Sequence, residues 1–135
     1  MNALGTAARG LNPKMRLVGV EAELFPSMFN LLHERNEPLG GDTLAEGIAV
    51  KEPGAFTSKV LRPLLDELVL VTESQLETAV ALLLQIEKTV VEGAGAAGLA
   101  AVMAYRHLFR GRKVGVVLTG TDLYHDIQAD APAQG

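Results

Sequence analysis

Three short apolar runs, separated by segments with helical periodicity, place the strongest constraint on how this chain folds. They occupy residues 17–20 (LVGV), 68–71 (LVLV) and 114–118 (VGVVL). Strands that are buried on both faces of a parallel sheet show continuous apolar runs, whereas half-exposed strands alternate. We therefore predict strands over residues 16–21, 67–71 and 113–118, in an α/β layered architecture with a mainly parallel sheet and flanking helices.

The segments between these runs carry helix signals. Thr72, followed three residues later by Gln75, has the pattern of a capping box, so a helix should begin at Glu73 and continue to about Glu87. We expect Leu76, Val80, Leu83 and Leu84 to form its apolar side, with Glu73, Glu77 and Glu87 left for water. Further helices are predicted over residues 3–10, 26–34, 57–65 and 93–108.

The size and composition of the chain fit one globular domain. At 135 residues and 48% hydrophobic content, we predict a single domain over residues 1–128 and a mobile tail over 129–135. A net charge of -4 without a basic block disfavours nucleic acid and anionic membranes as partners. The chain has no cysteine and no apolar run near the roughly 18 residues of a spanning helix, so we expect a cytoplasmic protein.

Residues 36–54 are rich in Gly, Pro and Asp and are longer than a simple connection. Loops of this kind in compact domains are often functional. The three histidines, His33, His107 and His125, lack i, i+4 spacing, and no H-E-x-x-H or G-x-S-x-G motif is present. We therefore assign no catalytic residue and no metal ligand from such motifs.

A glycine cluster at residues 92–98 (EGAGAAG) contains a literal G-x-G-x-x-G, from Gly93 to Gly98. One interpretation is a nucleotide-binding turn, in which glycines let the backbone approach a pyrophosphate at a helix N-terminus. The other is close helix packing, because each glycine within a helix costs about 1 kcal/mol relative to alanine and backbone contact with a neighbour would justify it. We favour packing, since only residues 89–91 are available as an entering strand.

Three stretches together carry a family resemblance. They are residues 41–51 (GDTLAEGIAVK), 66–71 (DELVLV) and 90–98 (VVEGAGAAG). In this order and spacing they resemble the pyridoxal-phosphate-dependent threonine dehydratases and the serine dehydratase and racemase-like enzymes of the tryptophan-synthase-β fold (fold type II). The similarity covers residues 1 to about 120 and implies part of that fold's large domain.

The resemblance also implies what this chain does not contain. Family members hold pyridoxal phosphate as an imine on a lysine in their N-terminal half, and bind its phosphate with a tetraglycine loop just upstream of the segment that matches Met1. Neither is present here, and Lys51, the best substitute, is expected to be a solvated surface residue. We therefore expect no cofactor in this chain and no catalysis by it alone.

Three cofactor-facing positions do carry over by resemblance. Gly47 matches the loop that passes the cofactor ring, Glu92 matches a carboxylate lining the active site, and Thr119 stands where the family has Ser or Cys near the pyridine nitrogen. We interpret them as vestigial, with structural roles as a turn glycine, a helix-start acid and a strand-end residue. Glu21 matches a divalent-metal carboxylate of the racemase-like branch, but one carboxylate does not make a metal site.

After Gly120 the family continues with Gly-Asn, whereas this chain has Thr121-Asp122 and the resemblance stops. The resemblance thus predicts a stand-alone, dehydratase-like fragment that is not catalytic alone, associating either with itself or with a missing N-terminal half. The first alternative is a non-enzymatic binding or interaction module that uses the loop at residues 36–54 and the uncovered side of the sheet to hold a partner or a metabolite. The second is a nucleotide-binding domain that uses Gly93 to Gly98.

Overall fold

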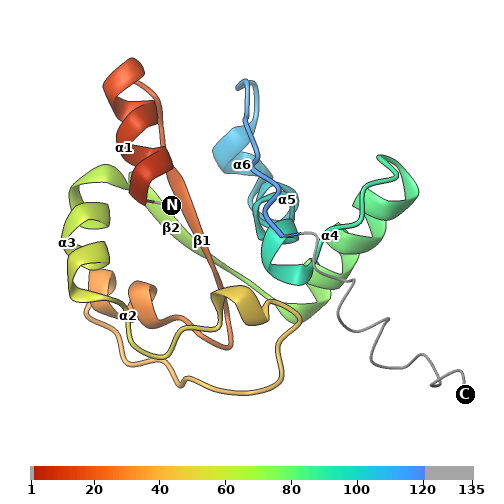
Figure 1. Cartoon of the computed structure of the whole chain (residues 1–135), viewed down its shortest axis with the longest axis horizontal. Helices are drawn as coiled ribbons and strands as arrows, with labels where there is room; N and C mark the ends of the chain where they lie inside the picture. The colour runs from red at the N-terminus through yellow and green to blue at the C-terminus, as the bar shows by residue number, and fades with distance from the viewer. Residues whose placement is uncertain (1, 121–135) are drawn as a thin grey trace, which may run out of the picture.

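The computed structural model describes residues 2–120 and has the predicted α/β architecture (Figure 1). Strands β1 (Val18–Ala22) and β2 (Glu67–Val71) pair in parallel, with Val18 opposite Glu67 and Ala22 opposite Val71. The flanking elements are α1 (Asn2–Leu11), α2 (Ser27–His33), the 3-10 turn η1 (Glu46–Ile48), α3 (Ala55–Leu64), α4 (Glu73–Gln85), α5 (Gly93–Ala104) and α6 (Arg106–Phe109). The predicted mainly parallel sheet with flanking helices is confirmed.

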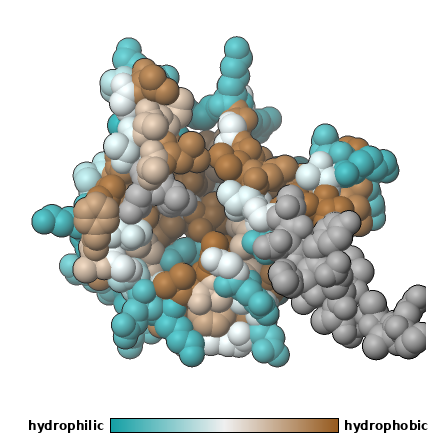
Figure 2. Space-filling model, in the orientation of Figure 1, coloured by the Kyte–Doolittle hydropathy of each residue, from teal (hydrophilic) through white to brown (hydrophobic). Residues whose placement is uncertain are grey.

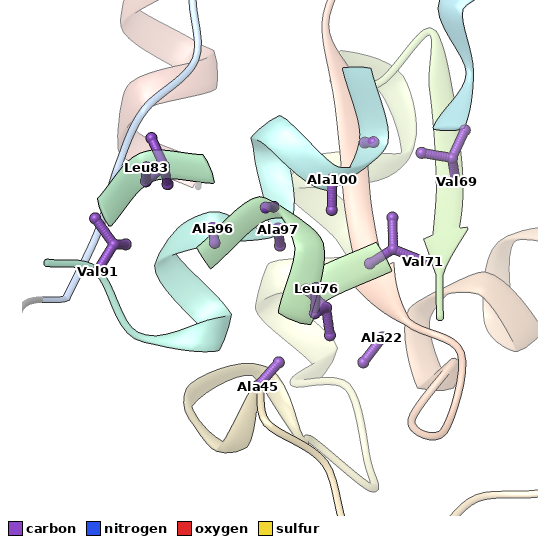
Figure 3. Packing of buried hydrophobic residues seen from close by; sticks show 12 residues of the cluster. Ala22, Ala45, Val69, Val71, Leu76, Leu83, Val91, Ala96, Ala97 and Ala100 are labelled. Atoms are coloured by element: carbon purple, nitrogen blue, oxygen red, sulfur yellow. The ribbon is translucent and has the colours of Figure 1, made fainter. Parts of the chain in front are cut away.

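The helices lie in two groups on opposite sides of the strands, with α1 to α3 on one side and α4 to α6 on the other (Figure 1). Each group has its own apolar core. The smaller one joins Met28 of α2, Leu61 of α3 and Leu68 of β2. The larger one packs α4 and α5 against the strands, and Figure 3 shows its members. The continuous apolar run of β2 is explained by these two cores, because the strand has one on each face.

Helix α4 begins where the capping box predicts. The Thr72 hydroxyl accepts a hydrogen bond from the Gln75 N–H (3.3 Å), and the Gln75 side chain accepts one from the Thr72 N–H (2.9 Å). The buried face comprises Leu76, Ala79 and Leu83. The prediction was wrong for Leu84, whose side chain is 51% exposed. A helix turns by 100° per residue, so two consecutive leucines do not share one narrow face.

Two other expectations are corrected. Residues 113–118 form no strand in the described part of the chain, because no neighbouring strand there accepts or donates their backbone hydrogen bonds. The helix predicted over 93–108 is split at Tyr105, whose hydroxyl donates to the Leu70 carbonyl of β2 (2.6 Å). The expected domain boundary at residue 128, the tail and His125 lie outside the described residues.

Candidate functional site

The structure brings the three cofactor-facing positions inferred from the family resemblance to one place. Glu92 is the residue at the N-terminus of α5, Gly47 lies in η1, and Thr119 precedes Gly120 in the last described segment. The Glu92 N–H donates to the Gly120 carbonyl (3.4 Å). A Cβ atom built on Gly47 would lie 3.3 Å from Glu92 Oε1. Gly47, 45 residues before Glu92, and Gly120, 28 residues after it, thus both lie beside its carboxylate.

Two glycines allow the Glu92 carboxylate to occupy this position. A Cβ atom on Gly120 would overlap Glu92 Oε1, and the φ angle of Gly120 is +76°, a left-handed conformation that favours glycine. The half-buried carboxylate makes no hydrogen bond that caps α5. The structural interpretation of Glu92 as a helix-start acid therefore describes its place in the chain, but its carboxylate does not cap the helix.

The glycine cluster of α5 serves close packing, as we predicted. A Cβ atom on Gly93 would overlap the Leu44 carbonyl oxygen, and one on Gly95 would overlap the Thr119 carbonyl oxygen. At Gly98 it would lie 2.8 Å from Val116 Cγ1. Protein backbone thus occupies the space that a pyrophosphate would need beside the first two glycines. These contacts disfavour the nucleotide-binding alternative.

A carboxylate that the sequence analysis left for water holds the loop at residues 36–54. Glu73 accepts a hydrogen bond from the Thr43 hydroxyl at Oε1 (2.7 Å) and another from the Leu44 N–H at Oε2 (2.7 Å). Ala45, the next residue, is fully buried in the larger core. The loop is therefore held at residues 43–45, just before Gly47. No local pattern around Glu73 indicated this role, because its partners lie about thirty residues earlier in the chain.

The Glu21 carboxylate is held by backbone N–H groups at the start of α2. Its carboxylate oxygens accept hydrogen bonds from the Met28 N–H (2.9 Å) and the Phe29 N–H (2.8 Å), at the start of α2. Burial raises the pKa of Glu21 above its ordinary value, and these two hydrogen bonds with that from Ser27 partly oppose the increase. Within residues 2–120 no three His, Cys, Asp or Glu side chains are grouped to hold a metal ion. The Glu21 lone pairs are already used by the backbone.

The described residues do not make up a complete pyridoxal phosphate site. Gly47 and Gly120 lie beside the Glu92 carboxylate, and Thr119, which precedes Gly120, is exposed. Every lysine in the sequence, Lys51 included, is exposed, so the prediction for Lys51 is confirmed. An imine-forming amine needs a desolvated position, which none of these lysines has. These residues therefore provide neither a covalent anchor nor a phosphate cradle, and they do not fit the whole cofactor.

A sequence model of the family described as pyridoxal-phosphate dependent enzymes matches residues 1–120. The chain belongs to this family. It is 38% identical over 125 residues to L-threonine ammonia-lyase from Thermotoga maritima, covering 91% of this chain and 31% of that protein. It is 39% identical to the enzyme of the same name from Geobacter sulfurreducens, covering 89% of this chain and 30% of that protein. The chain thus spans about a third of the length of these relatives.

Solved structures agree with the family assignment. A threonine deaminase from T.th. superimposes with a TM-score of 0.72 at 33% identity, covering 79% of this chain and 36% of that structure. Maize serine racemase superimposes with a TM-score of 0.80 at 25% identity, covering 95% of this chain and 42% of that structure. The predicted resemblance to threonine dehydratases and racemase-like enzymes is therefore confirmed. Within residues 2–120, no helix is long and apolar enough to span a membrane.

Proposed function

We propose that this chain forms one wall of a threonine ammonia-lyase-like active site and does not deaminate amino acids by itself. The observation that carries the proposal is that Gly47 and Gly120 both lie beside the half-buried carboxylate of Glu92, while every lysine is exposed. Similarity to two L-threonine ammonia-lyases supports threonine as the substrate class. The amine and the phosphate-binding glycines would come from polypeptide outside residues 1–135, in the same protein or in another.

The chemistry explains why such a wall is insufficient. Pyridoxal phosphate, when it is bound, supplies the electron sink that acidifies the α-proton of an amino acid. Capture of the aldehyde requires a lysine amine that is neutral at working pH, and burial or a neighbouring cation normally provides this state. A lysine exposed to water is normally protonated and solvated. The wall at Glu92 shapes and polarises one side of a site without anchoring the cofactor.

The test compares the chain alone with a complemented chain. Purified chain, mixed with pyridoxal phosphate and L-threonine or L-serine, should release no 2-oxo acid or ammonia above the cofactor-only control. It should also show no imine absorbance that borohydride traps on a lysine. Co-expression with the portion of the Thermotoga maritima enzyme outside the matched residues should restore turnover. Turnover by the purified chain without any companion polypeptide would refute the proposal.

A specific feature supports the alternative of a non-enzymatic binding module. An open hollow of about 550 Å³ is lined by Leu24, Phe29, Arg35 and the loop at residues 37–40, and its lining does not include Gly47 or Glu92. This alternative predicts that a ligand at the hollow raises the midpoint of thermal unfolding of the chain alone. The substitution Arg35→Ala would remove that increase and leave the complemented lyase assay unchanged.

We further propose a cytoplasmic location, which the absence of cysteine supports. We also propose that the isolated chain self-associates, because several large apolar side chains stand exposed, including Leu11 and Ile86. Light scattering of the purified chain should give a mass above 14.3 kDa. A clean monomer at working concentration would contradict self-association.

A further inference from the structure

The turn η1, which carries Gly47, depends on one distant side chain for its hydrogen bonds to the rest of the molecule. Its own backbone hydrogen bonds join neighbouring residues of the turn. Within residues 2–120, two hydrogen bonds join residues 41–53 to another segment, and Glu73 accepts both of them. Burial of Ala45 adds an apolar contact, which has no preferred direction. Glu73 therefore provides the directional contacts that decide where the turn stands.

Glu73 can act as a fixed point because its own backbone is held. It is the first residue of α4, and the capping box fixes the start of that helix. Its Oε1 accepts a hydrogen bond from the Thr43 hydroxyl (2.7 Å), and the oxygen of that hydroxyl accepts one from the Ala45 N–H (3.1 Å). Its Oε2 accepts a hydrogen bond from the Leu44 N–H (2.7 Å). Three consecutive residues of the loop are thus tied to one carboxylate, directly or through one hydroxyl.

Leu44 is held at both of its backbone polar groups. Its N–H donates to Glu73 at the start of α4, and its carbonyl oxygen occupies the space that a Cβ atom on Gly93 would need at the start of α5. The two helices pack against each other in the larger core, to which Ala45 also belongs (Figure 3). Leu44 is therefore clamped between the starts of two helices that are fixed relative to each other.

The clamped loop leads directly to the candidate site. Gly47 is three residues after Leu44, and a Cβ atom built on Gly47 would lie 3.1 Å from Ala94 Cβ and 3.3 Å from Glu92 Oε1. The turn is the short gold segment low in the middle of Figure 1, and Figure 2 shows apolar residues gathered above it, at the centre of the same view. A shift of the turn would therefore change the rim of this apolar region and the distance from Gly47 to Glu92 together.

We propose that Glu73 is a positioning residue of the candidate site, which through Leu44 sets where Gly47 stands beside Glu92. The proposal rests on the proposed function, because it assigns Glu73 a part in that site. The Glu73 oxygens are engaged by the loop, so Glu73 acts on the site only through Leu44. Misplacement of a site residue by about 1 Å can cost about a hundredfold in rate. Loss of the clamp should therefore lower turnover even while the chain stays folded.

Two NMR signals of the chain alone report this position. A nuclear Overhauser effect should join the Gly47 Hα to the Ala94 methyl group, because a Cβ atom on Gly47 would lie 3.1 Å from that carbon. Another should join the Gly93 Hα to the Leu44 side chain, because a Cβ atom on Gly93 would lie 2.7 Å from Leu44 Cγ. A side chain that only stabilised the folded state would change neither signal while circular dichroism shows the chain to be folded.

Four variants separate the clamp from a general effect on stability. Glu73→Ala should remove both signals or weaken them several-fold, and Thr43→Val should weaken them too, which keeps the test available where the first variant does not fold. Glu73→Gln keeps an acceptor for the Leu44 N–H and a donor toward the Thr43 hydroxyl oxygen, so it should keep both signals. The matched control Glu77→Ala, one turn along α4, should leave them unchanged.

The second readout uses the chain co-expressed with the portion of the Thermotoga maritima enzyme outside the matched residues. There Glu73→Ala should lower kcat/KM for L-threonine by about ten- to a hundredfold. Glu77→Ala should change it by less than about twofold, as expected of a surface substitution. No turnover by the complemented, unaltered chain would count against the proposed function, and the two NMR signals would then decide the position of Gly47 by themselves.

Three results would overturn the inference. The first is that both NMR signals persist unchanged in Glu73→Ala, or weaken equally in Glu77→Ala. The second is that Glu73→Gln loses them as fully as Glu73→Ala, because the charge rather than the two hydrogen bonds would then hold the loop. The third is that Glu73→Ala loses the signals and keeps full turnover in the complemented chain, which would refute the positioning role and leave the proposed function standing.

Discussion

Replacing Glu73 by alanine should loosen the loop that carries Gly47 to the candidate site. The change removes the acceptor of the Thr43 hydroxyl and of the Leu44 N–H, each at 2.7 Å. A hydrogen bond to a charged group contributes about 1.5–3 kcal/mol when it is buried. The Leu44 bond is exposed, so water compensates part of that loss. We therefore expect a decrease of about 1–3 kcal/mol in the free energy of unfolding.

Glu73→Ala should destabilise the loop around Leu44 locally, in addition to lowering the free energy of global unfolding. Amide exchange of Leu44 and the following residues should accelerate by about tenfold for each 1.4 kcal/mol of local destabilisation. Urea unfolding measures the global change, and exchange measured by mass spectrometry or NMR locates it. The substitution Thr43→Val removes both the donor to Glu73 and the acceptor of the Ala45 N–H (3.1 Å). A double-mutant cycle with Glu73→Ala isolates the first of these and should give a coupling energy of about 0.5–2 kcal/mol.

The matched control is Glu77→Ala. Glu77 lies one turn further along α4, is exposed and makes no side-chain hydrogen bond within the described residues. Surface substitutions of this kind usually change stability by less than about 0.5 kcal/mol. If Glu73→Ala and Glu77→Ala gave equal stability and equal exchange at Leu44, Glu73 would not anchor the loop.

Three further predictions concern other parts of the molecule. Burial raises the pKa of Glu21 in the folded chain above 4.5, its ordinary value, so the contribution of Glu21 to stability is greatest at a pH below its pKa in the unfolded chain and is lost as pH rises through its pKa in the folded chain. Urea unfolding across this pH range should show the free energy of unfolding falling as pH rises, and Glu21→Gln should flatten that dependence. The hydrogen bond from the Leu17 N–H and, to a smaller extent, Arg9 lower the pKa of Asp66 in the folded chain below 3.8. The stability that Asp66 contributes is therefore present above pH 3.8 and is lost as pH falls through its lower pKa in the folded chain. Asp66→Asn should remove this sensitivity to acid in urea unfolding, and an unchanged pH profile would contradict the assignment. Gly95→Ala forces a Cβ atom into the Thr119 carbonyl and should lower the free energy of unfolding in urea by about 1–3 kcal/mol. Its control, Gly115→Ala, places a Cβ atom where no other atom lies within 4 Å and should be near neutral. Similar values for both variants would show that the contact at Gly95 is not tight.

Features carried by neighbouring residues were predictable from the sequence. The capping box from Thr72 to Gln75 and the apolar runs of β1 and β2 lie within short windows. Local propensity and periodicity therefore decided where α4 begins and which runs are buried, whereas the family was indicated by the resemblance of residues 41–51, 66–71 and 90–98 to known enzymes. The packing role of the α5 glycines was also foreseen, since three glycines near a helix start need a close neighbour.

Other features depended on residues far apart in the chain. The sequence did not indicate that Glu73 would meet Thr43, and the family resemblance, not any local pattern, placed Gly47, Glu92 and Thr119 at one site. It wrongly predicted a strand at residues 113–118, because a strand exists only when a second strand supplies its hydrogen bonds. The amino-acid sequence by itself determined the local elements and the family. Only the tertiary structure decided that Glu73 holds Thr43 and Leu44 and that Gly120 lies against Glu92, because these contacts join residues that the chain brings close only by folding.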